Sequence, residues 1–232
     1  MKTKPKKQYR VVLFDVDDTI FQYVASSWHS LQNTCQSLGL PCTPAVRDYY
    51  RELDKRMWDT ERHSAMTIPQ LLDTRGREMA RWLGKAEAGA DFARIFYENM
   101  CREIVPVPGM AEVLREIYRD FRLYTASNGV RGMQEARLIQ AGLRECFVDV
   151  PVSDDLGYEK PDPRFFTALF AHYGVSAEEV LMVGDNLRAD IGGSVNAGID
   201  CCWFNWLRQP NDRGLTPTYE IAEAAELLKI LQ

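Results

Sequence analysis

Short runs of apolar residues recur along the chain, and longer segments with helical spacing of apolar positions separate them. The first run, "YRVVLFDV" at residues 9–16, is rich in β-branched residues, which is typical of a buried strand. Later runs of the same character predict strands at 121–127, 146–153, 179–185 and 199–205. This alternation predicts parallel pairing and a layered α/β core.

The stretch 21–105 breaks the alternation, because its apolar positions keep helical spacing without a convincing strand pattern. It predicts roughly four helices inserted after the first strand. The proline-rich segment "IVPVPGM" at 104–110 then marks the return to alternating elements. We therefore predict a core formed by 8–20 and 106–232, and a separate all-helical domain at 21–105.

Several residues predict where helices begin or end. Gly142, Gly174 and Gly198 stand where the apolar helical pattern stops. Ser176 has the spacing of a capping box with a glutamate three residues later, just before a strand. His172 falls late in a helix, where a positive charge complements the helix dipole.

Composition narrows the class of protein. Hydrophobic residues make up 46% and charged residues 26% of the 232 residues, as in ordinary globular chains. A net charge of −5 argues against a basic surface for nucleic-acid polymers. The lysine-rich start, "MKTKPKK", is expected to be a solvated terminus, and no apolar stretch predicts a signal peptide or a membrane span.

The six cysteines form no C-x-x-C pair and no disulfide framework, so they are expected to be reduced thiols. Cys201 and Cys202 lie in the apolar run "IDCCWF" and are expected in a strand core. Together these features favour a cytoplasmic protein. The oligomeric state stays open between monomer and homodimer.

Three acids follow the first strand in "FDVDDTIF" at 14–21, namely Asp15, Asp17 and Asp18. Ionised carboxylates repel one another and are costly to desolvate. Either they are solvated in a turn, or a cation lies among them. The choice depends on what the other strand ends contribute.

Polar residues also follow the later strands, and ligands in such sheets bind beyond the carboxyl ends of the strands. The set comprises Ser127, Asn128, Lys160, Asp185 and Asp190. Clustered carboxylates suit Mg²⁺, while a hydroxyl, an ammonium group and backbone amides suit a phosphate group. A carboxylate can also act as a nucleophile, and a second one as acid and then base.

Four segments in order resemble the motifs of the haloacid dehalogenase-like superfamily. "FDVDDTIF" resembles its D-x-D-x-T motif, "LYTASNG" its second motif, "YEKPDP" its lysine motif and "VGDNLRAD" its G-D-x4-D motif. The resemblance covers nearly the whole chain, although the helical insertion matches only in type. It implies a Rossmann-like three-layer core with a parallel sheet and an inserted helical cap domain.

The resemblance also implies catalytic and metal-binding roles. Asp15 would be the nucleophile, and Asp17 would protonate the leaving group and then activate water. Asp15, the backbone carbonyl of Asp17 and Asp185 would hold Mg²⁺. Asp190 would support the metal site, and Thr19 would help to shape the catalytic turn together with Asp18.

Phosphate recognition is implied for three further positions. Ser127 and Asn128 would bind the phosphoryl oxygens, and Lys160 would pair with both the nucleophile and the phosphate. Asn186 and Arg188 lie beside the last motif and either support the site or belong to a solvated loop.

The acid at Asp17 separates two activities of the superfamily. Dehalogenase members lack an acid there, because a halide needs no proton, whereas an alkoxide leaving group does. Asp17 therefore favours hydrolysis of a small-molecule phosphate ester. A non-catalytic protein that binds a phosphometabolite, and a phosphotransferase or mutase, remain alternatives.

A narrower resemblance concerns the substrate. "TASNGVRGMQEARLIQAGL", "VSDDLGYEKPDPRFF", "NAGIDCCWFN" and "PTYEI" are similar to a branch of nucleoside 5′-monophosphate phosphatases active on pyrimidine nucleotides. That branch commonly reads T-N-G in its second motif, where this chain has Ser127, Asn128 and Gly129. Sugar phosphates are the alternative substrates, since neighbouring branches accept them.

Aromatic residues of the helical insertion are expected to pack between helices rather than to stack on a base. Tyr23 and Trp28 lie nearest the first catalytic loop in sequence and are the best aromatic candidates for substrate contact. His29 and His63 lack metal-ligand spacing and are expected at the surface. The aromatic residues predicted to pack are Trp28, Tyr49, Tyr50, Trp58, Trp82 and Phe96.

Overall fold

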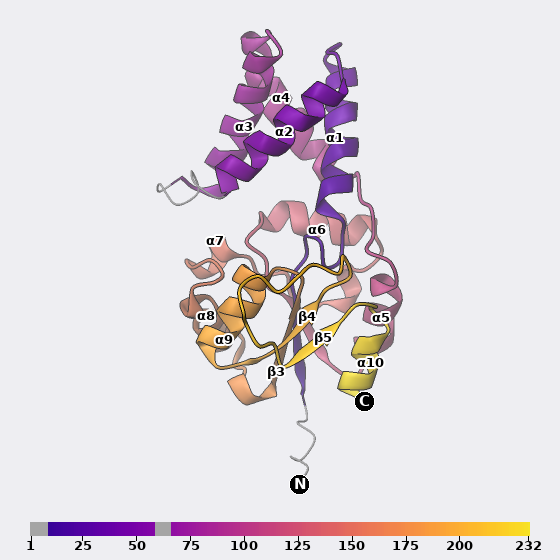
Figure 1. The fold of residues 1–232 in the computed structure, drawn as a ribbon, viewed down its shortest axis with the longest axis vertical. Helices are drawn as coiled ribbons and strands as arrows, with labels where there is room; N and C mark the ends of the chain where they lie inside the picture. Colours follow the sequence, from indigo (N-terminus) through magenta and orange to yellow (C-terminus); the bar gives the residue numbers. More distant parts are fainter. Residues whose placement is uncertain (1–8, 59–65) are drawn as a thin grey trace, which may run out of the picture. The chain divides into compact units, whose positions relative to one another are not determined.

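The computed structural model describes residues 9–58 and 66–232, so the lysine-rich start and His63 lie outside the described residues. Contacts divide the chain into two compact units (Figure 1). The sheet unit comprises Met1–Gln22, Pro106–Arg131 and Gly142–Gln232. The helical unit comprises Tyr23–Val105 and Gly132–Ala141, the latter a segment that the sequence-based boundaries place with the core.

Five parallel strands form the sheet in the order β2-β1-β3-β4-β5. Phe14, the last residue of β1, pairs in register with Thr125 of β2 and Val183 of β3. The carboxyl ends of these three strands therefore meet at one edge. The strands are β1 Val11–Phe14, β2 Arg122–Thr125, β3 Val180–Gly184, β4 Asp200–Phe204 and β5 Tyr219–Ile221.

Helices cover both faces of the sheet, which confirms the three-layer α/β core (Figure 1). Helices α8 (Pro163–Tyr173) and α9 (Gly193–Ala197) lie on one side, and α5 (Met110–Ile117) and α10 (Glu226–Leu231) on the other. On the α8 side, alternate strand residues pack against buried aromatic side chains of the helix, and full burial of each such side chain stabilises the fold by about 1.5–3 kcal/mol. This cluster includes Val11, Leu13, Tyr124, Val180, Met182, Cys201, Phe165, Phe166 and Leu169.

The prediction of a strand at 146–153 is wrong. A 3-10 helix, η4 (Arg144–Cys146), is followed by two isolated bridges to the β2 segment and then by the short helix α7 (Ser153–Leu156). Pro151 has no N–H to contribute to a ladder, and its carbonyl accepts from the Thr125 hydroxyl at 2.9 Å. The sequence pattern did not predict the short edge strand β5, because three residues with a glutamate in the middle form no apolar run.

Helix ends largely follow the predicted signals. Gly174 ends α8 in the left-handed conformation with φ 61°, and His172 lies exposed in the last turn of that helix. The capping box predicted at Ser176 is wrong, since its side chain makes no cap hydrogen bond to η5 (Ala177–Glu179). The Ser176 hydroxyl instead contacts the Glu178 carboxylate.

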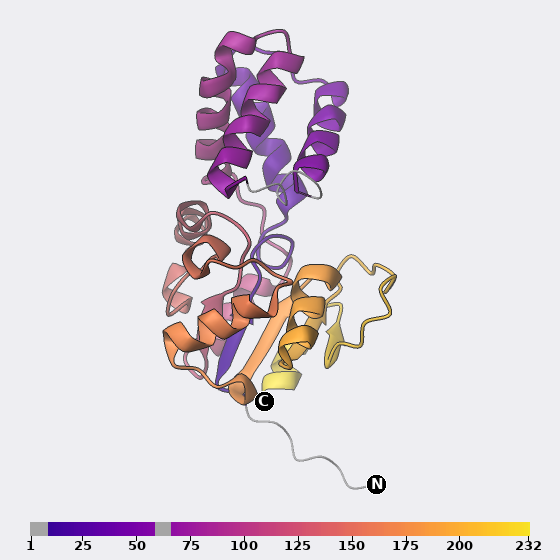
Figure 2. The ribbon, with the colours of Figure 1, turned by 90° about the vertical axis from the view of Figure 1, so that its left-hand side faces the viewer.

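The helical unit contains the four predicted helices, which Figure 2 shows side by side. Their amphipathic faces meet in a common core, and α3 begins with a capping box in which Thr67 and Gln70 bond reciprocally. At Gly76 a Cβ would lie 2.5 Å from the Cα of Ala93, so glycine allows close approach of α3 and α4. The four predicted helices are α1 Tyr23–Ser37, α2 Pro44–Arg56, α3 Ile68–Trp82 and α4 Gly89–Met100, and the short η3 (Ala86–Ala88) precedes α4. All of α6 (Arg131–Gln140) except its first residue also belongs to this unit.

A buried arginine joins the helices of this unit. The guanidinium of Arg75 lies over the rings of both Tyr50 and Phe96, 5.4 and 5.0 Å from their centroids, and the two rings are themselves 5.4 Å apart. It donates to the Tyr23 hydroxyl at 3.0 Å and to the Asp54 carboxylate. Burial of Tyr50 and Phe96 confirms their packing role.

The other aromatic candidates of the helical unit are less buried. Tyr49 and Trp82 stack with centroids 4.5 Å apart, and Trp82 is 44% exposed. The Arg47 guanidinium lies 5.7 Å from the centroid of the Trp28 ring. Substrate contact by Tyr23 or Trp28 stays a prediction. His29 is exposed, as expected.

All six cysteines are free thiols, and Cys201 and Cys202 are buried in β4, as the apolar run predicted. Across residues 9–58 and 66–232, we find no helix with the length and apolar character needed to cross a membrane.

Candidate active site

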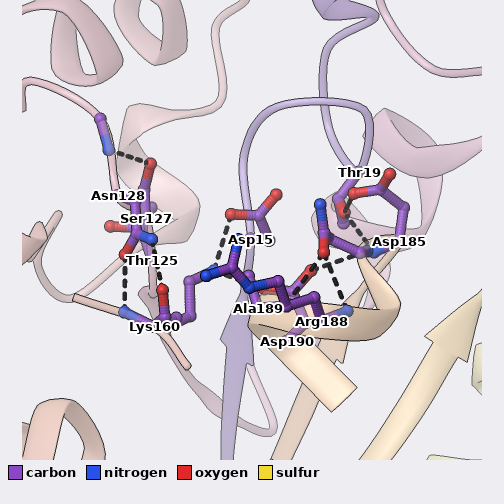
Figure 3. Close-up of polar contacts among 12 residues, drawn as sticks. Asp15, Thr19, Thr125, Ser127, Asn128, Lys160, Asp185, Arg188, Ala189 and Asp190 are labelled. Carbon is purple, nitrogen blue, oxygen red and sulfur yellow. Dashed lines mark hydrogen bonds and ion pairs between the residues drawn. The ribbon is translucent and has the colours of Figure 1, made fainter. Parts of the chain in front are cut away.

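Asp15 is the first residue after β1, and its position is set by the sheet. Its N–H donates to the carbonyl of Val183 at 2.9 Å, which continues the pairing of β1 with β3. One carboxylate oxygen accepts from the Lys160 ammonium at 2.9 Å (Figure 3). The side chain is only 13% exposed, so the ion pair lies in a largely dry environment.

Lys160 is the cation of the site. Its side chain is 2% exposed and its ammonium donates to the carboxylates of both Asp15 and Asp190. Burial alone would lower the pKa of this amine, but the two carboxylates hold it above its usual value. The lysine therefore stays protonated and balances part of the negative charge.

Asn128 positions the lysine from the end of β2. Its side-chain amide donates to the carbonyl of Lys160 at 2.8 Å, and its side-chain oxygen accepts from the N–H of Lys160 at 2.9 Å. The side chain of Asn128 thus holds the peptide of Lys160. Contact between Asn128 and a phosphate stays a prediction.

Asp190 lies fully buried behind the lysine. One of its carboxylate oxygens accepts from Lys160, and the other accepts from the N–H of Asn186 at 2.9 Å. A Cβ at Gly184 would lie 2.2 Å from that second oxygen, so only glycine leaves room for the carboxylate. This close approach explains why the G-D-x4-D motif has a glycine at the position that faces its second aspartate.

The segment between Asp185 and Asp190 turns back at Asn186. The Asn186 side chain accepts from the N–H groups of Arg188 and Ala189 at 3.0 and 2.9 Å. It thereby caps η6 (Leu187–Gly192), the π-helical turn that carries Asp190. Asn186 therefore shapes the loop, whereas the side chain of Arg188 is exposed.

Asp185 follows β3 and is held by Thr19. The hydroxyl of Thr19 accepts from the N–H of Asp185 at 3.1 Å and donates to its carboxylate at 3.3 Å. Thr19 is fully buried, so this hydroxyl links the first acidic loop to the last one.

Three carboxylates gather at this edge, and ligand atoms of Asp15, Asp185 and Asp190 all lie within 4.8 Å of one another. Burial raises the pKa of Asp15 to about 8, although Lys160 opposes the shift. Burial and the neighbouring carboxylates also raise the pKa of Asp185 well above its usual value. One ammonium cannot neutralise three carboxylates, so the residues fit a hard divalent cation with oxygen ligands.

The remaining acids of the first loop differ in position. The carboxylate of Asp17 is not among the three that gather, and its residue pairs with Phe21 in an isolated bridge. Asp18 adopts a left-handed conformation with φ 58°. Its N–H donates to the carbonyl of Phe21 at 2.7 Å, which closes the turn.

Ser127 lies at the end of β2 and is 1% exposed. Its hydroxyl oxygen accepts from the N–H of Gly129 at 3.0 Å, and its carbonyl accepts from the N–H of Ser153. The turn after β2 therefore fixes a hydroxyl beside the Asn128–Lys160 contact (Figure 3).

Two residues were missed by sequence reasoning. The indole N–H of Trp203 donates to the carbonyl of Asp185 at 2.8 Å, and that of Trp206 donates to the carbonyl of Asp18 at 2.7 Å. Their sequence, "WFNW", reads only as the end of an apolar strand. No local signal identifies these two long-range contacts.

Known proteins resemble this chain over nearly its whole length. The HAD-hydrolase YfnB of Bacillus subtilis is 33% identical over 97% of this chain and 96% of its own. Two pyrimidine 5′-nucleotidases are also similar: PynA of Streptococcus pneumoniae at 32% identity, covering 96% and 95%, and YjjG of Escherichia coli at 28%, covering 95% and 96%.

Structural comparison agrees with the sequence comparison. The crystal structure of YfnB bound to magnesium has a TM-score of 0.86 at 32% identity, and the match covers 97% of this chain and 100% of that one. The family model for haloacid dehalogenase-like hydrolases matches residues 9–198, which include Asp15, Lys160, Asp185 and Asp190. The chain therefore belongs to the haloacid dehalogenase-like hydrolase family and is an enzyme of that fold.

Proposed function

We propose that this enzyme is a Mg²⁺-dependent phosphomonoester hydrolase that works through an aspartyl-phosphate on Asp15. The observation that carries the proposal is the meeting of Asp15, Lys160 and Asp185 at one sheet edge, with the Ser127 hydroxyl at the next strand end. This set combines a nucleophile, a fixed cation and a candidate divalent-ion site. Hydrolysis of a phosphate ester through a phosphorylated carboxylate uses all three, the nucleophile to attack and the cations to offset the charge of the phosphoryl group.

The first chemical step would form a bond between a carboxylate oxygen of Asp15 and phosphorus. The ester P–O bond breaks, and Asp17 gives its proton to the departing alkoxide oxygen. Lys160 and Ser127 would bind phosphoryl oxygens during this transfer. Their fixed positions lower the barrier because no rearrangement of charge is needed at that moment.

The second step would return the enzyme to its starting state. Asp17, now ionised, takes a proton from water, and the water oxygen attacks phosphorus. The bond to Asp15 breaks, which releases inorganic phosphate. Mg²⁺ bound by Asp15, the main-chain carbonyl of Asp17 and Asp185 would supply positive charge that offsets the phosphate and carboxylate charges.

For the substrate we propose pyrimidine nucleoside 5′-monophosphates. The resemblance to PynA and YjjG, both pyrimidine 5′-nucleotidases, supports this class. The chain departs from the T-N-G reading of that branch at Ser127, yet keeps a hydroxyl there. Sugar phosphates are the alternative class, and a binding protein without turnover is the non-enzymatic alternative.

A phosphate-release screen with Mg²⁺ tests the proposal. Nucleoside 5′-monophosphates, sugar phosphates and a chromogenic phosphate ester would be compared, and pyrimidine nucleotides should give the highest kcat/KM. Chelation with EDTA should abolish release, and excess Mg²⁺ should restore it. Binding of phosphate analogues without release from any ester would favour the binding protein, and halide release from a haloacid would favour a dehalogenase.

Asn128→Ala should lower kcat about tenfold to a hundredfold with a smaller change in KM. The substitution removes both hydrogen bonds that hold the Lys160 peptide, so the ammonium is less well placed at the reacting phosphate. Steady-state kinetics on the chromogenic ester measure the effect. Asn196→Ala, at an exposed position of α9, is the matched control. Unchanged kcat in Asn128→Ala would show that this contact does not position Lys160.

A further inference from the structure

Two tryptophans outside the cluster of carboxylates contact the main chain of the loops that follow β1 and β3. Trp203 is the fourth residue of β4 and Trp206 lies in the turn that follows it. Their indole N–H groups donate to the main-chain carbonyls of Asp185 and Asp18, at 2.8 and 2.7 Å. We call Trp203 and Trp206 the tryptophan brace.

Each indole hydrogen bond ends on the main chain of one of the two loops that carry the acids. Asp18 has a left-handed conformation that costs more for aspartate than for glycine, and its main chain is held at the N–H by Phe21 and at the carbonyl by Trp206. The main chain of Asp185 is held at the N–H by Thr19 and at the carbonyl by Trp203. Both acidic loops are thus fixed on two sides.

The two indoles belong to one rigid stretch of chain. Between them, the side chain of Asn205 donates to the carbonyl of Gln209 at 2.9 Å and accepts from its N–H at 2.7 Å. It also donates to the Glu220 carboxylate at 3.0 Å, and its own N–H donates to the carbonyl of Ile221 at 2.8 Å. These contacts tie the turn to β5, so both indoles extend from one hydrogen-bonded segment.

We propose that Trp203 and Trp206 are positioning residues that set the separation of the two acidic loops for divalent-metal binding. The loops after β1 and β3 contribute Asp15 and Asp185, whose carboxylate oxygens lie within 4.8 Å of each other, so that like charges there repel. Hydrogen bonds from outside the charged cluster oppose that repulsion without adding charge. The brace thereby keeps the ligand set ready for the ion, which rests on the Mg²⁺ site of the proposed function.

Mg²⁺ binding measured by calorimetry tests the brace independently of turnover. Trp206→Phe keeps an aromatic ring but removes the indole donor, and Trp206 is only partly buried, so the variant should fold. Its Kd for Mg²⁺ should rise about tenfold, the size expected for a lost contact behind a metal ligand. Activity should need about tenfold more Mg²⁺, while kcat at saturating Mg²⁺ should fall less than threefold.

Two further variants complete the test. Trp203→Phe should weaken Mg²⁺ binding similarly, and Trp82→Phe, at a partly exposed site in the helical unit, should leave the Kd unchanged. A lower unfolding midpoint with an unchanged Kd in Trp206→Phe would overturn the proposal, because the indole would then be merely structural. Tight Mg²⁺ binding by the unsubstituted protein without phosphate release would instead refute the proposed function. The tryptophan brace would then still be tested by the change in the Kd for Mg²⁺.

Discussion

Asp15→Asn is expected to reduce phosphate release by at least about a thousandfold, to near background, while the protein stays folded. An amide is a poor nucleophile, so the covalent step is lost. The amide oxygen can still accept from the Lys160 ammonium, and the change removes one of three crowded carboxylates. Stability should therefore be kept or increased when Mg²⁺ is absent.

Release of phosphate from the chromogenic ester and thermal unfolding monitored by circular dichroism measure the two effects. Asp154→Asn is a suitable control, because Asp154 is exposed on the short helix α7 and lies outside the cluster of three carboxylates. Turnover of Asp15→Asn within tenfold of the unsubstituted enzyme would contradict the assignment of Asp15 as the nucleophile.

Lys160→Met should lower both activity and stability. Its ammonium is the partner of two buried carboxylates, and removing one side of a buried ion pair typically costs about 3–5 kcal/mol. Because Asp15 and Asp190 would then lack this compensation, we expect a decrease of about 3 kcal/mol in the free energy of unfolding. The loss of a fixed cation at the phosphate should reduce kcat by about a thousandfold.

Urea unfolding and steady-state kinetics check this prediction against Lys229→Met, which removes an exposed lysine on α10. Lys160→Arg should recover part of the stability, because it restores the charge, but little of the activity, because the planar guanidinium has a different shape. If Lys160→Met unfolds at the same urea concentration as the control, the buried ion pairs do not stabilise the fold as proposed.

Sequence patterns predicted the elements whose structure depends on residues close together along the chain. Alternation of apolar runs with helical spacing predicted β1 to β4 and the four helices after β1, since both depend on local periodicity. The prediction of a strand at 146–153 was wrong because Pro151 cannot donate to a strand ladder and its carbonyl accepts from the Thr125 hydroxyl, so that only isolated bridges form. Its apolar composition cannot distinguish a strand from an extended segment with isolated bridges.

The sequence by itself determined which residues would stand at the strand ends, and hence the chemical types present: nucleophilic carboxylate, hydroxyl, ammonium and further acids. Only the tertiary structure decided how they are joined. Asn128 holds the peptide of Lys160, and Trp206 reaches the carbonyl of Asp18 across 188 positions of the chain. Such hydrogen bonds depend on the register of the sheet and on the path of the turns, so neither periodicity nor local composition can predict them.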